Sequence, residues 1–191
     1  MTQSRPPSHF ERLYQSNPDP WGFQTSPYEQ AKYCNSLHVL GDRHFASGLE
    51  VGCSIGVLTQ MLASRCVRLL GVDIVEAPLS SARTRCADVA HVRFERMQIP
   101  LDWPHEHFDL IVFSEVLYFL SADDIERCAR RVLDTLLPDG AVLLVNWTGE
   151  TDDPSPGDAA PDRFAAYTKD RLRITHQERH PNYRLELLIS A

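Results

Sequence analysis

The sequence lacks the features that would place it in a membrane or outside the cell. None of its apolar runs approaches the roughly 20 residues that a membrane-spanning helix needs. The opening stretch, MTQSRPPSHF, contains no apolar signal-peptide core. The five cysteines are odd in number and never form a C-x-x-C pair, which argues against a disulfide framework or a zinc knuckle. We therefore expect a cytoplasmic protein with reduced, mostly buried cysteines.

Positive charge is also scarce. The chain has 19 Lys and Arg against 26 Asp and Glu, for a net charge of −7 at pH 7. A field of this sign repels a phosphate backbone, so nucleic acid is a poor candidate partner. Two pairs of spaced histidines, at 105/107 and at 176/180, are more typical of solvated loop and strand positions than of a metal centre. No metal is expected.

From Gly48 onward, apolar runs alternate with helical patterns. Strands are expected at 49–52, 67–74, 91–95, 108–114 and 141–147, and helices at 55–65, 77–88 and 121–136. The last helix is the best delimited, because Ser121 and Asp124 form a capping box and Pro138-Asp139-Gly140 ends it. Repeated strand-helix-strand units predict a doubly wound, Rossmann-like α/β fold with a mostly parallel sheet.

The two ends of the chain depart from this alternation. Residues 171–179 and 183–189 predict an antiparallel C-terminal hairpin, and residues 149–163, rich in Pro, Gly and Asp, predict a mobile loop. We expect a single domain, in which residues 1–46 precede the α/β part at 47–191. The first segment contains the turn-forming Pro18–Gly22 and a helix from Tyr28 to about Arg43. It either packs on the sheet edge or forms a lid over the crevice at the strand ends.

The stretch GLEVGCSIG, residues 48–56, joins the first strand to a glycine loop. A Walker loop is excluded, because no lysine follows the second glycine. A dinucleotide fingerprint starting at Gly52 would need glycines where Ser54 and Val57 stand. The pattern [ED]-x-G-x-G-x-G, typical of S-adenosylmethionine sites, is met at Glu50, Gly52 and Gly56, with Ser54 in place of the middle glycine.

Two further carboxylates are expected at the ends of other strands. Asp73 ends the second strand, where an acid can accept hydrogen bonds from the ribose hydroxyls of any adenosine cofactor; a solvated strand-end aspartate is the alternative. Glu115 follows the buried strand FDLIVFS, with Tyr118 about one helical turn further on. This pair is a candidate for the reacting site. The alternative is that Glu115 bonds only neighbouring backbone while Tyr118 packs in the core.

At these residues the sequence resembles the class I S-adenosylmethionine-dependent methyltransferases and, more narrowly, the rhizobial nodulation N-methyltransferase family, NodS. The resemblance spans roughly residues 10 to 147 and rests on Asp19-Pro20-Trp21, Pro27-Tyr28-Glu29-Gln30, LEVGCSIGVLT, FDLIV, SEVLYFL and LLPDG. It implies transfer of a methyl group to the amine of a deacetylated glucosamine unit in a chitooligosaccharide. S-adenosylmethionine would be the cofactor and S-adenosylhomocysteine its product.

The resemblance also implies roles for individual residues. Those lining the methionine side of the cofactor would be Glu50, Gly52, Cys53 and Gly56. Ser54 and Ser114 are further candidates for contact with the cofactor. Asp73 would hold the ribose and Ile74 would pack on the adenine. Trp21 and Tyr28 would belong to the segment that closes the site.

Two positions depart from the pattern of the class. Ser54 replaces a small loop residue, which is acceptable if its φ angle stays negative. Met97 stands where the class often has an aspartate near the adenine amino group, so we expect the backbone N–H of Met97 or Gln98 to hold the adenine.

Methyl transfer requires an acceptor amine without its extra proton, held in line with the methyl carbon. We expect Glu115 to accept that proton or stabilise the charge, and Tyr118 to orient the amine. Three alternatives stay open. They are a small-molecule O- or N-methyltransferase with a non-sugar acceptor, a non-catalytic cofactor-binding regulatory module, and a nicotinamide oxidoreductase.

Overall fold

The structure is a computed structural model, and it describes residues 3–190. The chain forms two compact units, one comprising residues 6–98 and the other residues 99–190 together with 3–5. The expected single domain, divided at residue 46, stays a prediction.

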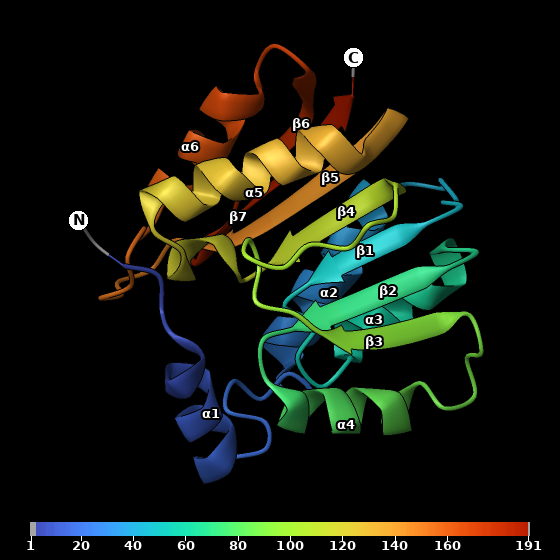
Figure 1. The fold of residues 1–191 in the computed structure, drawn as a ribbon, viewed down its shortest axis with the longest axis vertical. Coiled ribbons are helices and arrows are strands. Elements are labelled where there is room, and N and C mark those ends of the chain that lie inside the picture. The colour runs from blue at the N-terminus through green and yellow to red at the C-terminus, as the bar shows by residue number, and fades with distance from the viewer. Residues whose placement is uncertain (1–2, 191) are drawn as a thin grey trace. The chain divides into compact units, whose positions relative to one another are not determined.

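Residues 6–98 contain three parallel strands in the order β3-β2-β1 (Figure 1). They are β1 (Gly48–Val51), β2 (Leu69–Asp73) and β3 (Val92–Arg96). Every residue of β1 and β2 is buried, as expected for parallel strands that are covered on both faces. Because the strands run in the same direction, Val51 and Asp73, the last residues of β1 and β2, lie at the same edge.

The helices of this unit are α1 (Pro7–Ser16), α2 (Pro27–Val39), α3 (Val57–Leu62) with the 3₁₀ turn η1 (Ala63–Arg65), and α4 (Glu76–Arg85). The side chain of Ser26 caps α2, which ends at Val39 rather than near Arg43. Gly41 follows this helix with a φ angle of 61°, a conformation that terminates helices. Helix α1 was not predicted from the sequence, and Tyr14 is its only buried residue.

Residues 99–190 contain four strands in the order β4-β5-β7-β6. They are β4 (Phe108–Ser114), β5 (Leu136–Trp147), β6 (Leu172–Arg179) and β7 (Tyr183–Ser190). β4 and β5 pair in parallel, whereas β7 pairs antiparallel with both β5 and β6. The predicted C-terminal hairpin is therefore confirmed. β5 begins earlier than expected, because its pairing with β4 continues through an irregular register around Pro138–Gly140.

The helices of this unit are η2 (Leu117–Phe119), α5 (Ala122–Thr135) and α6 (Ala159–Thr168). The Ser121 side chain caps α5 by accepting a hydrogen bond from the Asp124 N–H, as its sequence predicts. The prediction of a loop at 149–163 is wrong beyond residue 158, where α6 begins. Pro161 falls in the first turn of α6, where a missing N–H costs no helical hydrogen bond.

Helix α6 lies beside α5 (Figure 1) and places the ring of Phe164 5.8 Å from that of Phe113 on β4. All five cysteines are free and only Cys34 is exposed, which confirms the expectation of mostly buried thiols. Within residues 3–190, no helix combines the length and the apolar character that crossing a membrane requires.

Candidate active site

The glycine loop after β1 turns on three residues with positive φ angles: Gly52 at 75°, Ser54 at 49° and Gly56 at 77°. The N–H groups of Gly52 and Cys53 both donate to the Val72 carbonyl of β2, which ties the start of the loop to the neighbouring strand. A Cβ atom added at Gly56 would lie 2.9 Å from the Cβ of Ala82 on α4. Glycine is therefore required at 56 both by backbone conformation and by the close approach of α4.

Ser54 does not meet the condition of a negative φ angle under which it was acceptable in the loop. Its φ of 49° aims its N–H at Oδ2 of Asp73, at 2.9 Å. Its Oγ lies 2.6 Å from the hydroxyl of Tyr14 on α1. A left-handed conformation at a residue with a side chain costs about 1–3 kcal/mol, which these two hydrogen bonds offset.

Asp73 ends β2, as predicted, and its carboxylate is held by backbone donors. Oδ1 accepts from Val75 N–H at 3.0 Å, and Oδ2 accepts from Ser54 N–H. Burial raises the pKa of Asp73 to about 6, although these backbone donors act in the opposite direction. Each carboxylate oxygen has a second lone pair, so the group can still accept hydrogen bonds from a ligand such as a ribose diol.

Glu50, in the middle of β1, is a buried acid with an unsatisfied oxygen. Only 2% of the residue is exposed, and Oε2 has no hydrogen-bond partner among residues 3–190. Burial, together with the charge of Asp73, raises the pKa of Glu50 to about 8. Buried polar atoms are normally paired, so this oxygen next to a glycine loop fits a cationic or hydrogen-bond-donating ligand group. S-adenosylmethionine carries both a sulfonium and an ammonium group, and the loop with its two acids suits it.

The positions expected around the adenine and the loop give a mixed outcome. Ile74 follows Asp73 and is half-buried, whereas Cys53 is buried and burial raises the pKa of its thiol. The N–H of Met97 donates to the Asp73 carbonyl at 2.9 Å. A strand-end hydrogen bond thus already uses the Met97 N–H, so the N–H of Gln98, the other expected donor to the adenine, stays the prediction. Gln98 lies next to Met97 and is half-buried.

Trp21 and Tyr28, the two residues expected to help close the site, lie at the surface. Their exposed fractions are 36% and 37%. The Trp21 ring contacts two other aromatic rings. Its centroid lies 5.7 Å from that of Tyr14 and 5.4 Å from that of Phe23. The Asp19 carboxylate accepts hydrogen bonds from the N–H groups of Phe23 and Gln24, which explains the turn at Asp19-Pro20-Trp21. Sequence reasoning missed Tyr14, since no motif marks it.

Glu115 belongs to the second unit, directly after Ser114, the buried last residue of β4. Its φ angle is 60°, an uncommon conformation that is often found at functional sites. Its Oε2 accepts a hydrogen bond from the N–H of Trp147 at 2.9 Å, and its own N–H donates to Val145. One oxygen of the Glu115 carboxylate thus bonds to backbone, as the alternative interpretation expected. This hydrogen bond holds the side chain at the C-terminal ends of β4 and β5.

Tyr118 lies in η2, and its buried ring packs 4.3 Å from that of Phe119. Two segments hold this turn. Arg5 N–H donates to the Phe119 carbonyl, and Ser155 N–H donates to the Tyr118 carbonyl. The segments are joined by the Arg5 side chain, which pairs with Asp153 at 2.8 Å and with Asp152 at 2.9 Å. Part of the loop expected to be mobile is thus anchored next to a candidate catalytic residue.

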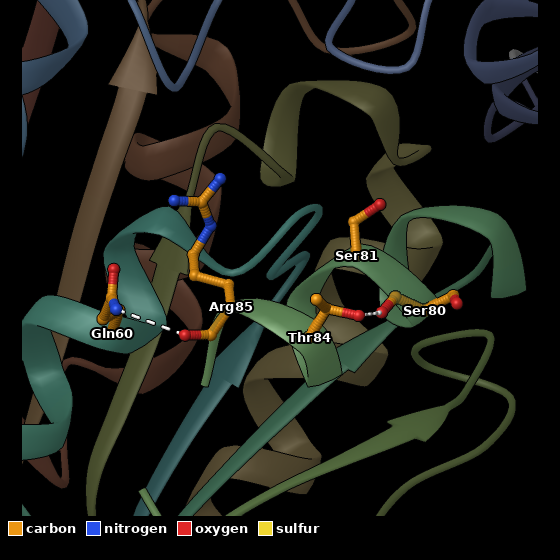
Figure 2. Close-up of a pocket in the computed structure, with 5 residues that line it drawn as sticks. All are labelled: Gln60, Ser80, Ser81, Thr84 and Arg85. Atoms are coloured by element: carbon orange, nitrogen blue, oxygen red, sulfur yellow. Dashed lines mark hydrogen bonds between the residues drawn. The ribbon is translucent and has the colours of Figure 1, made fainter. Parts of the chain in front are cut away.

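One open pocket lies outside the predicted site. It is lined by Gln60, Ser80, Ser81, Thr84 and Arg85, between α3 and α4 (Figure 2). None of the expected site residues lines it. Of the spaced histidines, His176 and His180 both contact one carboxylate, that of Glu178. No cluster of three or more His, Cys, Asp or Glu residues suited to a metal ion occurs in the described part of the chain.

Known structures share this architecture. The fold is similar to that of the N-methyltransferase NodS from Bradyrhizobium japonicum WM9, solved in complex with S-adenosyl-L-homocysteine, with a TM-score of 0.81 and 24% identity. The match covers 96% of this chain and 97% of that chain. The protein therefore has the doubly wound fold of the class I methyltransferases, with antiparallel C-terminal strands, as the sequence predicts.

The sequence comparison narrows this class to a family. The family model for nodulation protein S (NodS) matches residues 10–152, and the chain belongs to this family. It is 36% identical over 128 residues to nodulation protein S of Bradyrhizobium diazoefficiens and 33% identical over 128 residues to that of Rhizobium tropici. Each alignment covers 66% of this chain but only 61% and 54%, respectively, of the two relatives.

Proposed function

We propose that the protein is an S-adenosylmethionine-dependent N-methyltransferase whose acceptor is the free amine of a deacetylated amino sugar or chitooligosaccharide. The observation that carries the proposal is the Asp73 carboxylate, which the N–H groups of Ser54 and Val75 hold at the end of β2. An acid fixed there, one strand away from a glycine loop with a buried acid of its own, suits an adenosine cofactor that has no pyrophosphate. Membership of the NodS family supports the amine as acceptor.

In this proposal the cofactor supplies a methyl group activated by its positively charged sulfur. The residues that hold its methionine part are Glu50, Gly52, Cys53, Ser54 and Gly56. Asp73 accepts hydrogen bonds from the ribose, Ile74 packs on the adenine, and the N–H of Gln98 holds the base. The closing segment with Trp21 and Tyr28 excludes water from the site.

The acceptor amine must lose a proton before it can attack, because a protonated amine has no lone pair. Glu115 accepts this proton or stabilises the charge that develops on nitrogen. Its Oε2 is oriented by Trp147 N–H, and a carboxylate has further lone pairs for the amine. Tyr118, on the turn that follows, orients the amine by a hydrogen bond from its hydroxyl.

The proposal is tested by incubating the protein with S-adenosylmethionine and three acceptors, with release of S-adenosylhomocysteine as the readout. A deacetylated chitooligosaccharide should support turnover. Its fully acetylated counterpart, which has the same sugar rings but no free amine, should not. Turnover on a catechol instead would indicate an O-methyltransferase, and cofactor binding without turnover on any acceptor would indicate a regulatory module.

A further inference from the structure

The N-terminal segment is linked to the glycine loop at two consecutive residues, directly at Ser54 and through Arg85 of α4 at Ile55. At the first, Ser54, the partner is the hydroxyl of Tyr14, 2.6 Å from Oγ. At the second, Ile55, the partner is Arg85 of α4, whose Nε donates to the Ile55 carbonyl at 2.9 Å. The same guanidinium donates from Nη2 to Oε1 of Gln24 at 2.7 Å, so it links the loop to the N-terminal segment.

Arg85 is itself held in place. Its carbonyl accepts a hydrogen bond from the Gln60 side chain of α3, and its guanidinium points away from that contact (Figure 2). The side chain therefore has a fixed base on α4 and extends toward Ile55 and Gln24. A guanidinium has five N–H donors in a planar arrangement, which lets one side chain bond two acceptors at once.

We propose that Tyr14 and Arg85 are positioning residues that fasten residues 14–24 to the cofactor loop and thereby set the affinity for the cofactor. This inference rests on the proposed function, since it assigns a role relative to the same cofactor site. Neither residue belongs to the glycine motif.

The conformation of Ser54 connects Tyr14 to the cofactor acids. Ser54 has a φ of 49°, which a residue with a side chain seldom adopts without support. In that conformation its N–H reaches Asp73, the proposed ribose ligand. The bond from Tyr14 is the side-chain contact that supports it, and Tyr14 is itself only 8% exposed. The Tyr14 hydroxyl is protonated at physiological pH, as tyrosines ordinarily are, and burial raises its pKa further.

Residues 14–24 contain both contacts, that of Tyr14 with Ser54 and that of Gln24 with Arg85, and their rings pack together. Tyr14, Trp21, Phe23 and Tyr33 form a continuous run of ring contacts, at centroid distances of 5.7, 5.4 and 6.3 Å. The Asp19 carboxylate fixes the backbone at Gln24. Once one of these contacts is lost, the other should contribute less to the affinity for the cofactor. Substitutions at Tyr14 and Gln24 should therefore have non-additive effects.

The test is calorimetric titration of the full chain with S-adenosylhomocysteine. Tyr14→Phe keeps the ring and removes the hydroxyl, and we expect about 5–10-fold weaker binding, the effect of one lost hydrogen bond. In a Ser54→Gly background the same substitution should have no effect, because its hydrogen-bond partner is gone. Tyr167→Phe is the matched control, since that hydroxyl bonds Arg130 in the other unit.

Gln24→Ala provides a second variant that does not disturb the core, because Gln24 is exposed. It should weaken binding by about 3-fold, and by less in the Tyr14→Phe background. Hydrogen exchange gives an independent readout: the ligand should protect the amides of residues 7–24 in the unmodified chain and protect them less in both variants.

Equal affinity and equal protection for Tyr14→Phe and the unmodified chain would overturn the inference. So would an identical loss of affinity with and without Ser54→Gly, since Tyr14 would then act through another contact. If the unmodified chain itself binds no S-adenosylhomocysteine, the proposed cofactor site fails first, and the two failures are distinguishable.

Discussion

Glu115 Oε2 accepts a hydrogen bond from the backbone N–H of Trp147 at 2.9 Å, which joins the residue after β4 to the last residue of β5. The contact means that a strand end, rather than a flexible loop, fixes the direction of this carboxylate. A proton acceptor held in this way needs little reorganisation when a substrate arrives.

Glu115→Gln should leave the fold and the affinity for S-adenosylhomocysteine unchanged, because the amide oxygen can still accept from Trp147. Turnover on a competent amine should fall by about 10²–10⁴-fold, the usual contribution of an acid or base group. Steady-state rates and calorimetric titration separate the two effects. Glu126→Gln, at an exposed residue paired with Arg163 on the surface, serves as the control. Turnover at the rate of the unmodified chain would remove Glu115 from the mechanism.

The buried acid Glu50 predicts a pH dependence of stability. The pKa of Glu50 is raised from 4.5 to about 8 in the folded chain, so the folded state binds more protons than the unfolded state between these values. The contribution of Glu50 to stability is therefore complete below the lower value and is lost as the pH rises through the upper one. Glutamine at position 50 does not titrate. The free energy of unfolding of Glu50→Gln relative to that of the unmodified chain should therefore rise by on the order of a few kcal/mol from about pH 5 to about pH 9. Denaturant unfolding at several pH values measures this, and parallel curves for the two chains would contradict it.

Gly56→Ala should destabilise the protein through two effects. The φ angle of 77° strains any side chain, and the new Cβ would lie 2.9 Å from the Cβ of Ala82. We expect a loss of about 2–4 kcal/mol in the free energy of unfolding. Gly41→Ala is the matched control, because Gly41 has a φ of 61° but nothing within 4 Å of the added atom, and it should lose only about 1 kcal/mol. Equal losses would mean that the approach of α4 is not what requires glycine at 56.

Arg5→Ala should loosen the turn that carries Tyr118, because it removes the contacts of Arg5 with Asp152 and Asp153. Both pairs are partly solvated, so the loss of unfolding free energy should stay below about 1 kcal/mol. Turnover should fall several-fold while the affinity for S-adenosylhomocysteine is kept. Arg127→Ala, which removes an exposed pair with Asp124 on α5, should change neither quantity. A drop in cofactor affinity for Arg5→Ala would contradict this separation.

The sequence predicts those parts of the molecule in which a local pattern decides the structure. The apolar run 108–114 gives β4 with the same boundaries, and Asp73 lies at the end of β2, where its position after an apolar strand places it. The C-terminal hairpin is delimited by its own turn residues. In each case the signal lies within a few residues of the element.

The missed features depend on contacts between distant segments. The Pro and Asp residues at the start of helix α6 are typical of a loop, so the sequence did not predict this helix. Its buried positions include Ala160, Phe164 and the polar Thr168, which do not form a clear apolar pattern. The positive φ of Ser54 follows from Asp73, 19 residues away, and from Tyr14, 40 residues away. No short motif records such pairings, so they become visible only in the fold.

Titration with S-adenosylhomocysteine is the decisive measurement for an S-adenosylmethionine site at residues 50–73. We expect one-to-one binding to the unmodified chain and at least about 10-fold weaker binding to Asp73→Asn, in which one carboxylate oxygen becomes an amide donor. NAD should produce no binding heat with either chain. Binding of NAD instead of S-adenosylhomocysteine, or equal affinity of Asp73→Asn and the unmodified chain, would show that these residues do not form an S-adenosylmethionine site.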